Sequence, residues 1–317
     1  MKRIRWMNMK LSIIIVNYNT YTLTKQTIDS VLEKKLPFDY EIMLVDNASQ
    51  DDSMVKLQED YEEIIFQGIL HITLNEANLG FSKANNIGIR QAQGEYILLL
   101  NSDTYVVETC LQKCLQYMEQ QGAESIGALG CKVVLPDGTL DHACKRGFPT
   151  PKASLYYFLK LHKKDQVKYG IYDALHLDED EIGEVDCLMG AFMLMPRTVL
   201  EEVGLLDEDF FMYGEDIDLC YRIKEAGYKI VYYPEASIIH YKGGSSKKRR
   251  TKVIYDFHHA MWLFYQKHYK HQYAMAINGL VYVGIWAKYL LEIGKNAMKS
   301  TTTSQQPISV DQQKQSM

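Results

Sequence analysis

Short apolar runs alternate with amphipathic segments over the first hundred residues of the chain. The runs at 11–16, 41–45, 69–74 and 95–100 have the length and composition of strands that are buried on both faces. Between them, segments 20–35, 51–60 and 83–92 have the character of helices, and Pro37 and Gly94 mark the ends of the first and last. This alternation predicts an α/β fold with a mixed, mostly parallel sheet flanked by helices and joined by right-handed crossovers.

The pattern becomes less regular after about residue 105. A helix at 106–120 and a strand at 128–135 precede residues 141–183, which lack a clear period and are rich in Lys, Tyr and His. A long irregular segment inside a domain is usually functional or mobile. The remaining predicted elements are a strand over 184–196, helices over 198–203 and 216–226, and strands over 229–233 and 237–240.

The C-terminal part has a different composition. Residues 252–296 are helical in pattern and rich in aromatic side chains, but their most apolar run, 274–287, is shorter than the roughly 20 residues that span a bilayer. We therefore expect interfacial or core-docked helices. The predicted organisation is a main domain over 1–245, a helical extension over 246–298 that can associate with a membrane, and a disordered tail over 299–317, which is rich in Thr, Ser and Gln.

Composition narrows the functional classes. The chain has 317 residues, 47% hydrophobic and 24% charged, and its net charge of −5 does not favour a nucleic-acid partner. Basic residues outnumber acidic ones between 242 and 270, which fits either a phosphate or membrane contact or a solvated loop. The six cysteines show no paired CxxC spacing, which favours reduced thiols in the cytosol, and the N-terminal apolar run is too short for a signal peptide.

Three acidic clusters stand at or near predicted strand ends. They are 46–49, 101–103 and 214–218. In open α/β sheets the ligand lies beyond the carboxyl ends of the strands, where carboxylates can hold a nucleotide sugar, bind a divalent cation or accept a proton. Each cluster also has a simpler explanation as a turn or as charge at a helix N-terminus. Together they indicate group transfer from a phosphate-bearing donor.

Two further features of the sequence bear on phosphate and nucleotide binding. His240 precedes Tyr241-Lys242-Gly243-Gly244, a basic glycine loop that suits an approaching phosphate, although a packed polar histidine is an equal alternative. No glycine-rich dinucleotide fingerprint follows the first strand, and no P-loop is present, which argues against NAD-dependent chemistry and against an ATPase.

Five segments, taken in order, resemble the inverting family 2 glycosyltransferases of GT-A fold. They are Ser12-Ile13-Ile14-Ile15-Val16-Asn17-Tyr18-Asn19, Val45-Asp46-Asn47-Ala48-Ser49, Asn78-Leu79-Gly80-Phe81-Ser82-Lys83-Ala84-Asn85-Asn86, Leu100-Asn101-Ser102-Asp103 and Phe211-Met212-Tyr213-Gly214-Glu215-Asp216-Ile217-Asp218-Leu219-Cys220. Within that family the chain is most similar to bacterial rhamnosyltransferases of cell-surface polysaccharide synthesis. The resemblance covers residues 10–245 and is loose beyond them.

The resemblance implies roles for individual residues. Asp216 matches the catalytic base, with Glu215 in support. Asp103 matches the second aspartate of the family's metal motif, and His240 matches a histidine that meets the metal or the diphosphate. Asn101 stands where the family's metal motif has its first aspartate. The donor pocket would be lined by Asn17, Tyr18, Asn19, Asp46, Asn78, Gly80, Lys83 and Asn101, and the acceptor would lie near Met189, Gly190 and Ala191.

The implied reaction is inverting transfer of a sugar assisted by Mg²⁺ or Mn²⁺. The expected donor is dTDP-β-L-rhamnose and the expected acceptor a lipid-linked saccharide. Two alternatives remain open: a UDP-hexose or UDP-GlcNAc donor at the same site, and a non-catalytic scaffold that binds sugar nucleotides. The resemblance further implies a cytoplasmic enzyme, peripheral on the inner face of a bacterial plasma membrane, and is compatible with a homodimer.

Overall fold

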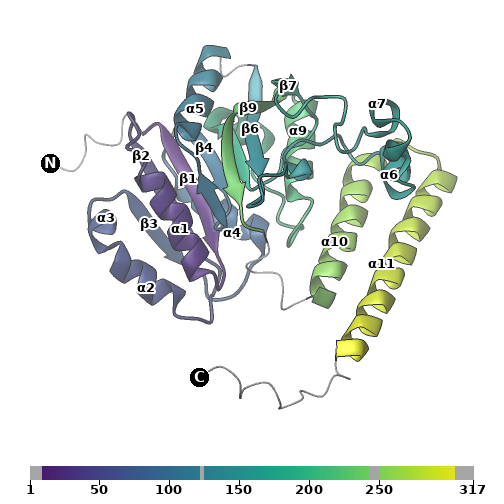
Figure 1. The fold of residues 1–317 in the computed structure, drawn as a ribbon, viewed down its shortest axis with the longest axis horizontal. Coiled ribbons are helices and arrows are strands. Elements are labelled where there is room, and N and C mark those ends of the chain that lie inside the picture. Colours follow the sequence, from purple (N-terminus) through teal and green to yellow (C-terminus); the bar gives the residue numbers. More distant parts are fainter. Residues whose placement is uncertain (1–8, 122–124, 243–249, 304–317) are drawn as a thin grey trace, which may run out of the picture. The chain divides into compact units, whose positions relative to one another are not determined.

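The computed structural model describes residues 9–121, 125–242 and 250–303 (Figure 1). The chain divides into two compact units between Ser245 and Ser246. The first unit contains the sheet and the acidic clusters, and the second is helical.

A single nine-stranded sheet organises the described residues of the first unit. Its strands are β1 (Leu11–Asn17), β2 (Tyr40–Asp46), β3 (Leu70–Leu74), β4 (Tyr96–Leu100), β5 (Thr104–Val106), β6 (Ile126–Val134), β7 (Gly183–Glu184), β8 (Phe192–Pro196) and β9 (Lys229–His240). They follow the order β3-β2-β1-β4-β8-β6-β9-β5, with β7 paired to β9. Pairs β1–β2, β2–β3, β1–β4 and β6–β9 are parallel, whereas β8 runs antiparallel to both β4 and β6.

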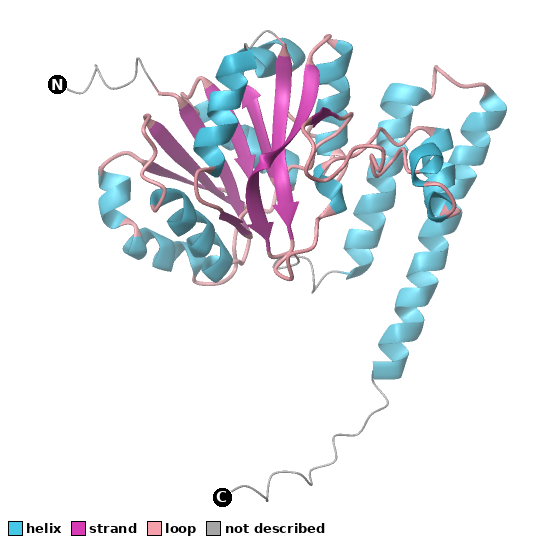
Figure 2. Cartoon of the chain, turned by 45° about the horizontal axis from the view of Figure 1, so that its top comes forward, coloured by secondary structure: helices cyan, strands magenta, loops and turns pink. Residues whose placement is uncertain are grey.

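Helices pack on both faces of this sheet (Figure 2). The helices of the first unit are α1 (Tyr21–Leu32), α2 (Ser53–Asp60), α3 (Glu62–Phe66), α4 (Phe81–Gln91), α5 (Cys110–Gln121), α6 (Pro151–Phe158), α7 (Gln166–Tyr169), α8 (Arg197–Val203) and α9 (Glu215–Glu225), with short 3₁₀ turns η2 (His142–Cys144) and η3 (Leu161–Lys163). Of these, α6 and α7 pack against each other and η3. The mixed α/β fold that the sequence predicts is confirmed.

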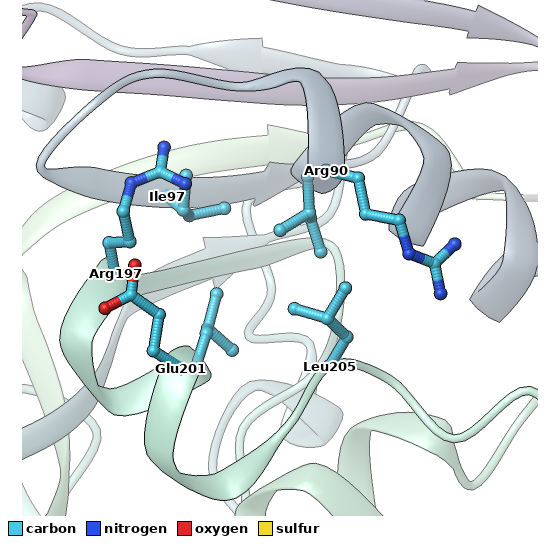
Figure 3. Close-up of a pocket in the computed structure, with 7 residues that line it drawn as sticks. Arg90, Ile97, Arg197, Glu201 and Leu205 are labelled. Atoms are coloured by element: carbon cyan, nitrogen blue, oxygen red, sulfur yellow. The ribbon is translucent and has the colours of Figure 1, made fainter.

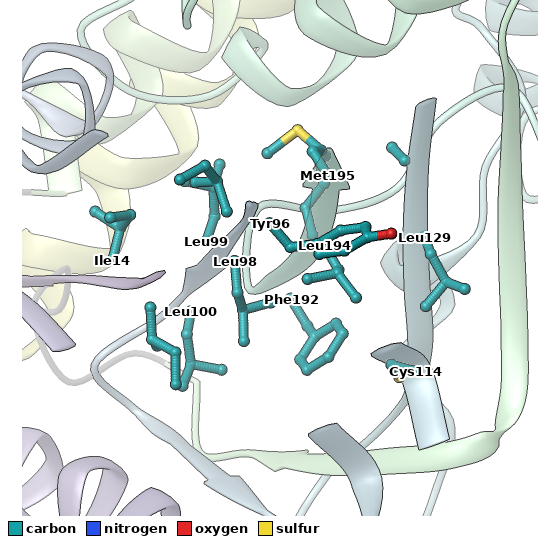
Figure 4. Packing of buried hydrophobic residues seen from close by; sticks show 14 of the residues in the cluster. Ile14, Tyr96, Leu98, Leu99, Leu100, Cys114, Leu129, Phe192, Leu194 and Met195 are labelled. Atoms are coloured by element: carbon teal, nitrogen blue, oxygen red, sulfur yellow. The ribbon is translucent and has the colours of Figure 1, made fainter. Parts of the chain in front are cut away.

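The core is continuous across the middle of the sheet. Leu98 on β4 and Met193 on β8 have no exposed surface, and neither do Ile13 and Ile42 on the parallel strands. Figure 4 shows side chains of β4 and β8 packed between their neighbours. Because burial of each large apolar side chain stabilises a fold by about 1.5–3 kcal/mol, this core fixes the strand ends that carry the polar clusters.

Three sequence predictions needed correction. The segment predicted as a helix from residue 106 begins with strand β5, and α5 starts only at Cys110. The single strand predicted over 184–196 consists of β7 and β8 with a turn between them. The two strands predicted over 229–240 form one strand, β9, in which Tyr233 pairs with Cys131 and Ser237 with Lys132. The intervening bulge accommodates Pro234, which has no N–H to donate to a regular ladder.

The segment 141–183, predicted as irregular, contains α6, α7 and the two 3₁₀ turns. Thr150 caps α6 by accepting a hydrogen bond from Ala153 N at 3.1 Å, and Pro151 occupies the first helical position. Local capping therefore begins a helix that hydrophobic periodicity alone does not reveal.

The second unit consists of α10 (Arg250–Phe264), the π-helical segment η4 (Tyr265–Tyr269) and α11 (Met275–Thr303). Asn278 fixes the turn between the helices, because it accepts a hydrogen bond from Tyr265 Oη at 2.6 Å and donates one to Lys270 O at 3.0 Å. α11 is longer than its most apolar run implied. Over Met275–Met298 it meets the length and hydropathy of a membrane-crossing helix, with a mean hydropathy of 1.2. Of the predicted tail over 299–317, residues 304–317 lie outside the described residues.

Candidate active site

The carboxyl ends of the parallel strands bring the predicted residues to one edge of the sheet. Asn17 and Asp46 are the register-paired last residues of β1 and β2, and Asn101 follows β4. Strand β8 is antiparallel to β4, so it begins at this edge, where Asn101 N donates to Ala191 O at 3.1 Å. His240 ends β9 opposite Thr104, the first residue of β5. Elements far apart in sequence therefore meet here.

A buried hydrogen-bond network joins β1 and β2 at this edge. Asn17 Nδ2 donates to Asp46 Oδ1 at 2.8 Å, and Asp46 also accepts from Ser49 Oγ at 2.6 Å and from Ser49 N at 3.0 Å. Asn19 has a positive φ of 55° and accepts a hydrogen bond from Gln50 N at 2.6 Å. Asp46 thus forms an Asx-type turn, one of the roles that the sequence left open. Its contact with a nucleobase remains a prediction, as do the donor contacts of Asn17, Tyr18 and Asn19.

Asn47, which was not among the predicted site residues, holds the neighbouring loop in place. Its Oδ1 accepts from Leu79 N at 2.9 Å, and its Nδ2 donates to Asn78 Oδ1 at 3.0 Å and to Gly80 O at 3.1 Å. The side-chain oxygen of Asn78 is therefore already hydrogen-bonded to Asn47. The signal for Asn47 was its place in the Asp46–Ser49 motif.

Gly80 attaches that loop to the segment before α9. Phe81 N donates to Phe211 O at 2.7 Å. Gly80 has φ +87°, and a Cβ at this position would lie 2.4 Å from Phe211 O, so only glycine allows this approach. Lys83 is exposed on the first turn of α4, which begins at this contact. The loop predicted to bind the donor thus touches the segment that leads to Glu215 and Asp216.

Asp103 and His240 lie side by side at the end of β9. His240 Nε2 is 3.1 Å from Asp103 Oδ1, and its Nδ1 is 3.3 Å from Asp141 Oδ2. Burial lowers the pKa of His240, but hydrogen bonds to the two carboxylates outweigh it and raise the pKa to about 9. Burial acts to raise the pKa of Asp141. Hydrogen bonds from His240 and Lys242 outweigh this effect and lower the pKa of Asp141 to about 2. The Lys242 Nζ is 2.8 Å from Asp141 Oδ1.

The donor atoms around Asp103 fit a hard divalent cation. Asn101 Oδ1 is buried and has no hydrogen-bond partner in the part of the chain that the structure describes, and it lies two residues before Asp103 in the sequence. Such cations prefer oxygen ligands and commonly take one or two carboxylates together with substrate phosphates. Among the described residues, no group of three or more His, Cys, Asp or Glu side chains could hold a metal ion by itself. The oxygens of Asp103 and Asn101 would therefore need those of a diphosphate.

Asp216, the predicted base, is bound by an arginine that the sequence did not single out. Arg146 Nη2 donates to Asp216 Oδ2 at 2.6 Å and to Leu188 O at 2.8 Å. The two side chains are 12% and 13% exposed. Asp218, in contrast, pairs with Arg222 at 2.8 Å, and Arg222 also binds carbonyls after α8. Asp218 therefore has a structural role on α9, whereas Asp216 is held by Arg146 and by Ile217 N, which donates to its Oδ1 at 2.8 Å.

Glu215 is buried beside Asp216. Its Oε2 has no hydrogen-bond partner among the described residues. Burial and the adjacent Asp216 charge raise the pKa of Glu215 to about 8. Within the described part of the chain, Glu215 is thus buried without a charged partner, whereas the adjacent Asp216 is paired with Arg146. Two neighbouring carboxylates in such different environments are typical of sites that transfer protons.

The predicted acceptor segment connects the two halves of the site. Leu188 O accepts from Arg146, and Ala191 O, three residues later, accepts from Asn101 N. Met189 and Gly190 lie between these contacts, and a Cβ on Gly190 would meet the Phe81 ring at 3.3 Å. Arg146, which binds Asp216, and Asn101, two residues before Asp103, therefore both bind backbone carbonyls of the same short segment, 188–191.

A cavity of about 260 Å³ lies elsewhere in the first unit, lined by Ile89, Arg90, Ile97, Arg197, Leu200, Glu201 and Leu205. Figure 3 shows side chains of α4, β4 and α8 around it. Ile97 is near the start of β4, and Arg197 directly follows the end of antiparallel β8. This cavity therefore belongs to the opposite edge of the sheet and is not the candidate site.

Curated relatives are similar to this chain over most of its length. The chain is 26% identical over 256 residues to the O-antigen biosynthesis protein RfbC of Myxococcus xanthus, covering 81% of this chain but only 19% of that protein. It is 29% identical over 231 residues to the rhamnosyltransferase WbbL of Escherichia coli, covering 68% and 84% of the two chains. It is 25% identical over 234 residues to the N-acetylglucosaminyl-diphospho-decaprenol L-rhamnosyltransferase of Mycobacterium tuberculosis, covering 70% and 73%.

Solved structures share the fold. The mannosyltransferase PcManGT of Pyrobaculum calidifontis, in complex with GDP-Man and Mn²⁺, matches with a TM-score of 0.58 at 16% identity, over 91% of this chain and 75% of that one. The predicted GT-A fold is thereby confirmed. The model of Glycosyl transferase family 2 matches residues 12–171, and that of Glycosyl transferase family group 2 matches residues 96–302. The chain therefore belongs to glycosyltransferase family 2, whose relatives take part in polysaccharide biosynthesis.

Proposed function

We propose that this protein is an inverting glycosyltransferase that moves L-rhamnose from dTDP-L-rhamnose to a lipid-linked saccharide. The observation that carries the proposal is that segment 188–191 binds both Arg146, the partner of Asp216, and Asn101, two residues before Asp103. A base and a diphosphate site at one sheet edge are what a one-step displacement needs.

In the proposed reaction the donor lies with its diphosphate against Asp103 and Asn101 and its anomeric carbon toward Asp216. Asp216 accepts the proton of an acceptor hydroxyl while that oxygen attacks the anomeric carbon. The bond to the diphosphate oxygen breaks on the opposite face, so the configuration inverts and the nucleoside diphosphate leaves with the bonding electron pair. Arg146 holds the Asp216 carboxylate in place through a hydrogen bond of 2.6 Å. A base positioned in this way contributes about 10²–10⁴-fold to the rate.

Asp103 would hold Mg²⁺ or Mn²⁺, with Asn101 as a further oxygen donor and His240 against the diphosphate. When bound, the cation would offset the negative charge that develops on the leaving diphosphate. The Mn²⁺ in the complex of PcManGT supports a divalent cation in this fold. His240 Nε2, 3.1 Å from Asp103 Oδ1, would then face either the cation or the diphosphate that the cation binds.

The choice of rhamnose and of a lipid-linked acceptor is supported by the two rhamnosyltransferase relatives, one of which is named for a diphospho-decaprenol acceptor. Membrane attachment on the cytoplasmic face is supported by α11, where Leu280 and Leu290 are 75% and 67% exposed. Deletion of residues 245–317 is expected to move the protein from the membrane to the soluble fraction.

The test compares the wild-type protein with Asp216→Asn. Incubation with dTDP-rhamnose and a polyprenyl-diphosphate saccharide should give transfer only with wild type, while both proteins bind the donor in a thermal-shift assay. Transfer by Asp216→Asn at the wild-type rate would remove Asp216 as the base. Donor binding by the wild type without transfer would favour a non-catalytic scaffold that binds sugar nucleotides. A stability shift with UDP-hexoses but not with dTDP-rhamnose would mean that the donor is a UDP-hexose.

A further inference from the structure

The long connection between β6 and β8 carries exposed apolar side chains. We call residues 150–171, which contain α6, η3 and α7, the basic lobe. Its aliphatic side chains Leu155, Leu159 and Val167 are 54%, 60% and 74% exposed. Large aliphatic side chains gathered in this way on so short a segment usually mark a contact with another molecule or with lipid.

The same segment is rich in lysine. The basic lobe contains Lys152, Lys160, Lys163, Lys164 and Lys168 against one acid, Asp165. Lys152 and Lys168 lie over the rings of Tyr156 and Tyr169 within the lobe, and none of the five lysines takes part in a salt bridge between described residues. Lysines beside exposed leucine, valine and aromatic side chains are the composition of segments that lie in the interface of a bilayer.

The basic lobe is connected to the proposed base. Tyr157 on α6 contacts Tyr172 with ring centroids 5.1 Å apart, and Gly147 N donates to Tyr172 O at 2.9 Å. Burial raises the pKa of Tyr172, and the neighbouring Arg146 opposes that rise, which places the phenol next to the guanidinium that binds Asp216. A molecule bound to the basic lobe near Tyr157 would therefore be close to Arg146 and Asp216.

We propose that the basic lobe docks on an anionic lipid surface and so presents a free hydroxyl of the membrane-anchored saccharide acceptor to Asp216. The proposal rests on the proposed function for the nature of the acceptor, but the docking itself does not. The positive charge favours anionic headgroups over a neutral surface, and Leu155, Leu159 and Val167 provide the apolar contact.

Labelling can locate the contact directly, because all six native cysteines are buried. Leu159→Cys in the full-length protein, carrying a polarity-sensitive dye, is expected to show a blue shift with phosphatidylcholine vesicles that contain phosphatidylglycerol. The matched control is Phe66→Cys, at a side chain that is 92% exposed and belongs to α3, which lies beside β3 at the far end of the sheet from α6 (Figure 1). That control should show no shift.

Either of two results would overturn the proposal. The first is vesicle binding without a blue shift of the dye at Leu159→Cys. The protein would then bind the membrane through other parts of the chain, and the basic lobe would contact a protein partner instead. The second is an equal shift with purely neutral vesicles, which would remove the role of the lysines. Absence of any binding to vesicles would refute lipid docking as a whole.

A charge variant separates this proposal from the proposed function. Each lysine near an anionic surface strengthens binding by about fivefold, so Lys160→Gln/Lys163→Gln/Lys164→Gln should weaken vesicle binding on the order of 100-fold. Its KM for the lipid-linked acceptor should rise, while transfer to a short-chain, water-soluble acceptor analogue stays at the wild-type rate. Equal loss with both acceptors would contradict docking, whereas no transfer by wild type to either acceptor would contradict the proposed function instead.

Discussion

The Arg146 guanidinium donates a hydrogen bond of 2.6 Å to the Asp216 carboxylate, and the two side chains are 12% and 13% exposed. Removal of one partner of such a pair leaves the other charge buried without compensation, which costs about 3–5 kcal/mol. The same guanidinium binds Leu188 O, so it fixes the carboxylate relative to the acceptor segment.

Arg146→Gln is therefore expected to lower kcat by about 100-fold, the scale of a misplacement of roughly 1 Å in a reacting group, with the donor KM almost unchanged. Arg146→Lys should recover part of kcat, because it restores the charge without the planar two-acceptor geometry. Steady-state kinetics per folded enzyme measure both effects. The control is Arg222→Gln, which breaks the Asp218 pair on the same helix and should lower stability only. Equal kcat losses in the two glutamine variants would make the role of Arg146 purely structural.

Gly80 offers a second test, of the contact between the donor loop and Phe211. In Gly80→Ala the new Cβ would clash with Phe211 O, so the loop must shift and the hydrogen bond from Phe81 N should weaken. We expect weaker donor binding and a lower unfolding temperature. Gly68→Ala is the matched control, because Gly68 also has a positive φ, +71°, but nothing lies within 4 Å of its Cβ position. It should cost about 1 kcal/mol of backbone strain and leave donor binding intact.

The sequence predicted the strand ends well because the signal there is local. The apolar runs before Asp46 and Asn101 correspond to the buried strands β2 and β4, and parallel pairing with β1 then brings their ends together. His240 could be placed near this edge for the same reason. These inferences need only the period of a strand and the direction of its neighbours.

The partner of Asp216 could not be predicted in that way. Arg146 is 70 residues from Asp216 in sequence and belongs to a segment without hydrophobic periodicity. Asp141, which binds His240, belongs to the same segment. A charge pair between distant loops leaves no local pattern, so only the folded chain reveals it. Likewise, nothing local indicated that Pro234 would sit in a bulge of one continuous strand.

Removal of the cation tests the role of Asp103. Chelation by EDTA should abolish transfer, and added Mg²⁺ or Mn²⁺ should restore it, because the diphosphate would otherwise leave with uncompensated charge. Asp103→Asn should raise the cation concentration for half-maximal activity at least tenfold, since it leaves no carboxylate between residues 101 and 103. Asp218→Asn is the control for loss of a buried acid near the site. Full activity of the wild type in EDTA would contradict a metal-dependent reaction.

Glu215 makes stability depend on pH in a defined direction. Burial and the Asp216 charge raise its pKa to about 8 from an ordinary 4.5, so the folded state keeps a proton that the unfolded state releases. The stabilisation by protonated Glu215 is complete below about pH 4.5 and is lost as pH rises to about 8, with a slope of at most about 1.4 kcal/mol per pH unit. Thermal unfolding of wild type and Glu215→Gln between pH 5 and 9 measures this loss as a difference. The wild type should lose stability relative to the glutamine variant up to about pH 8 and run parallel to it above. Parallel curves across the whole range would mean that Glu215 is already ionised at pH 5.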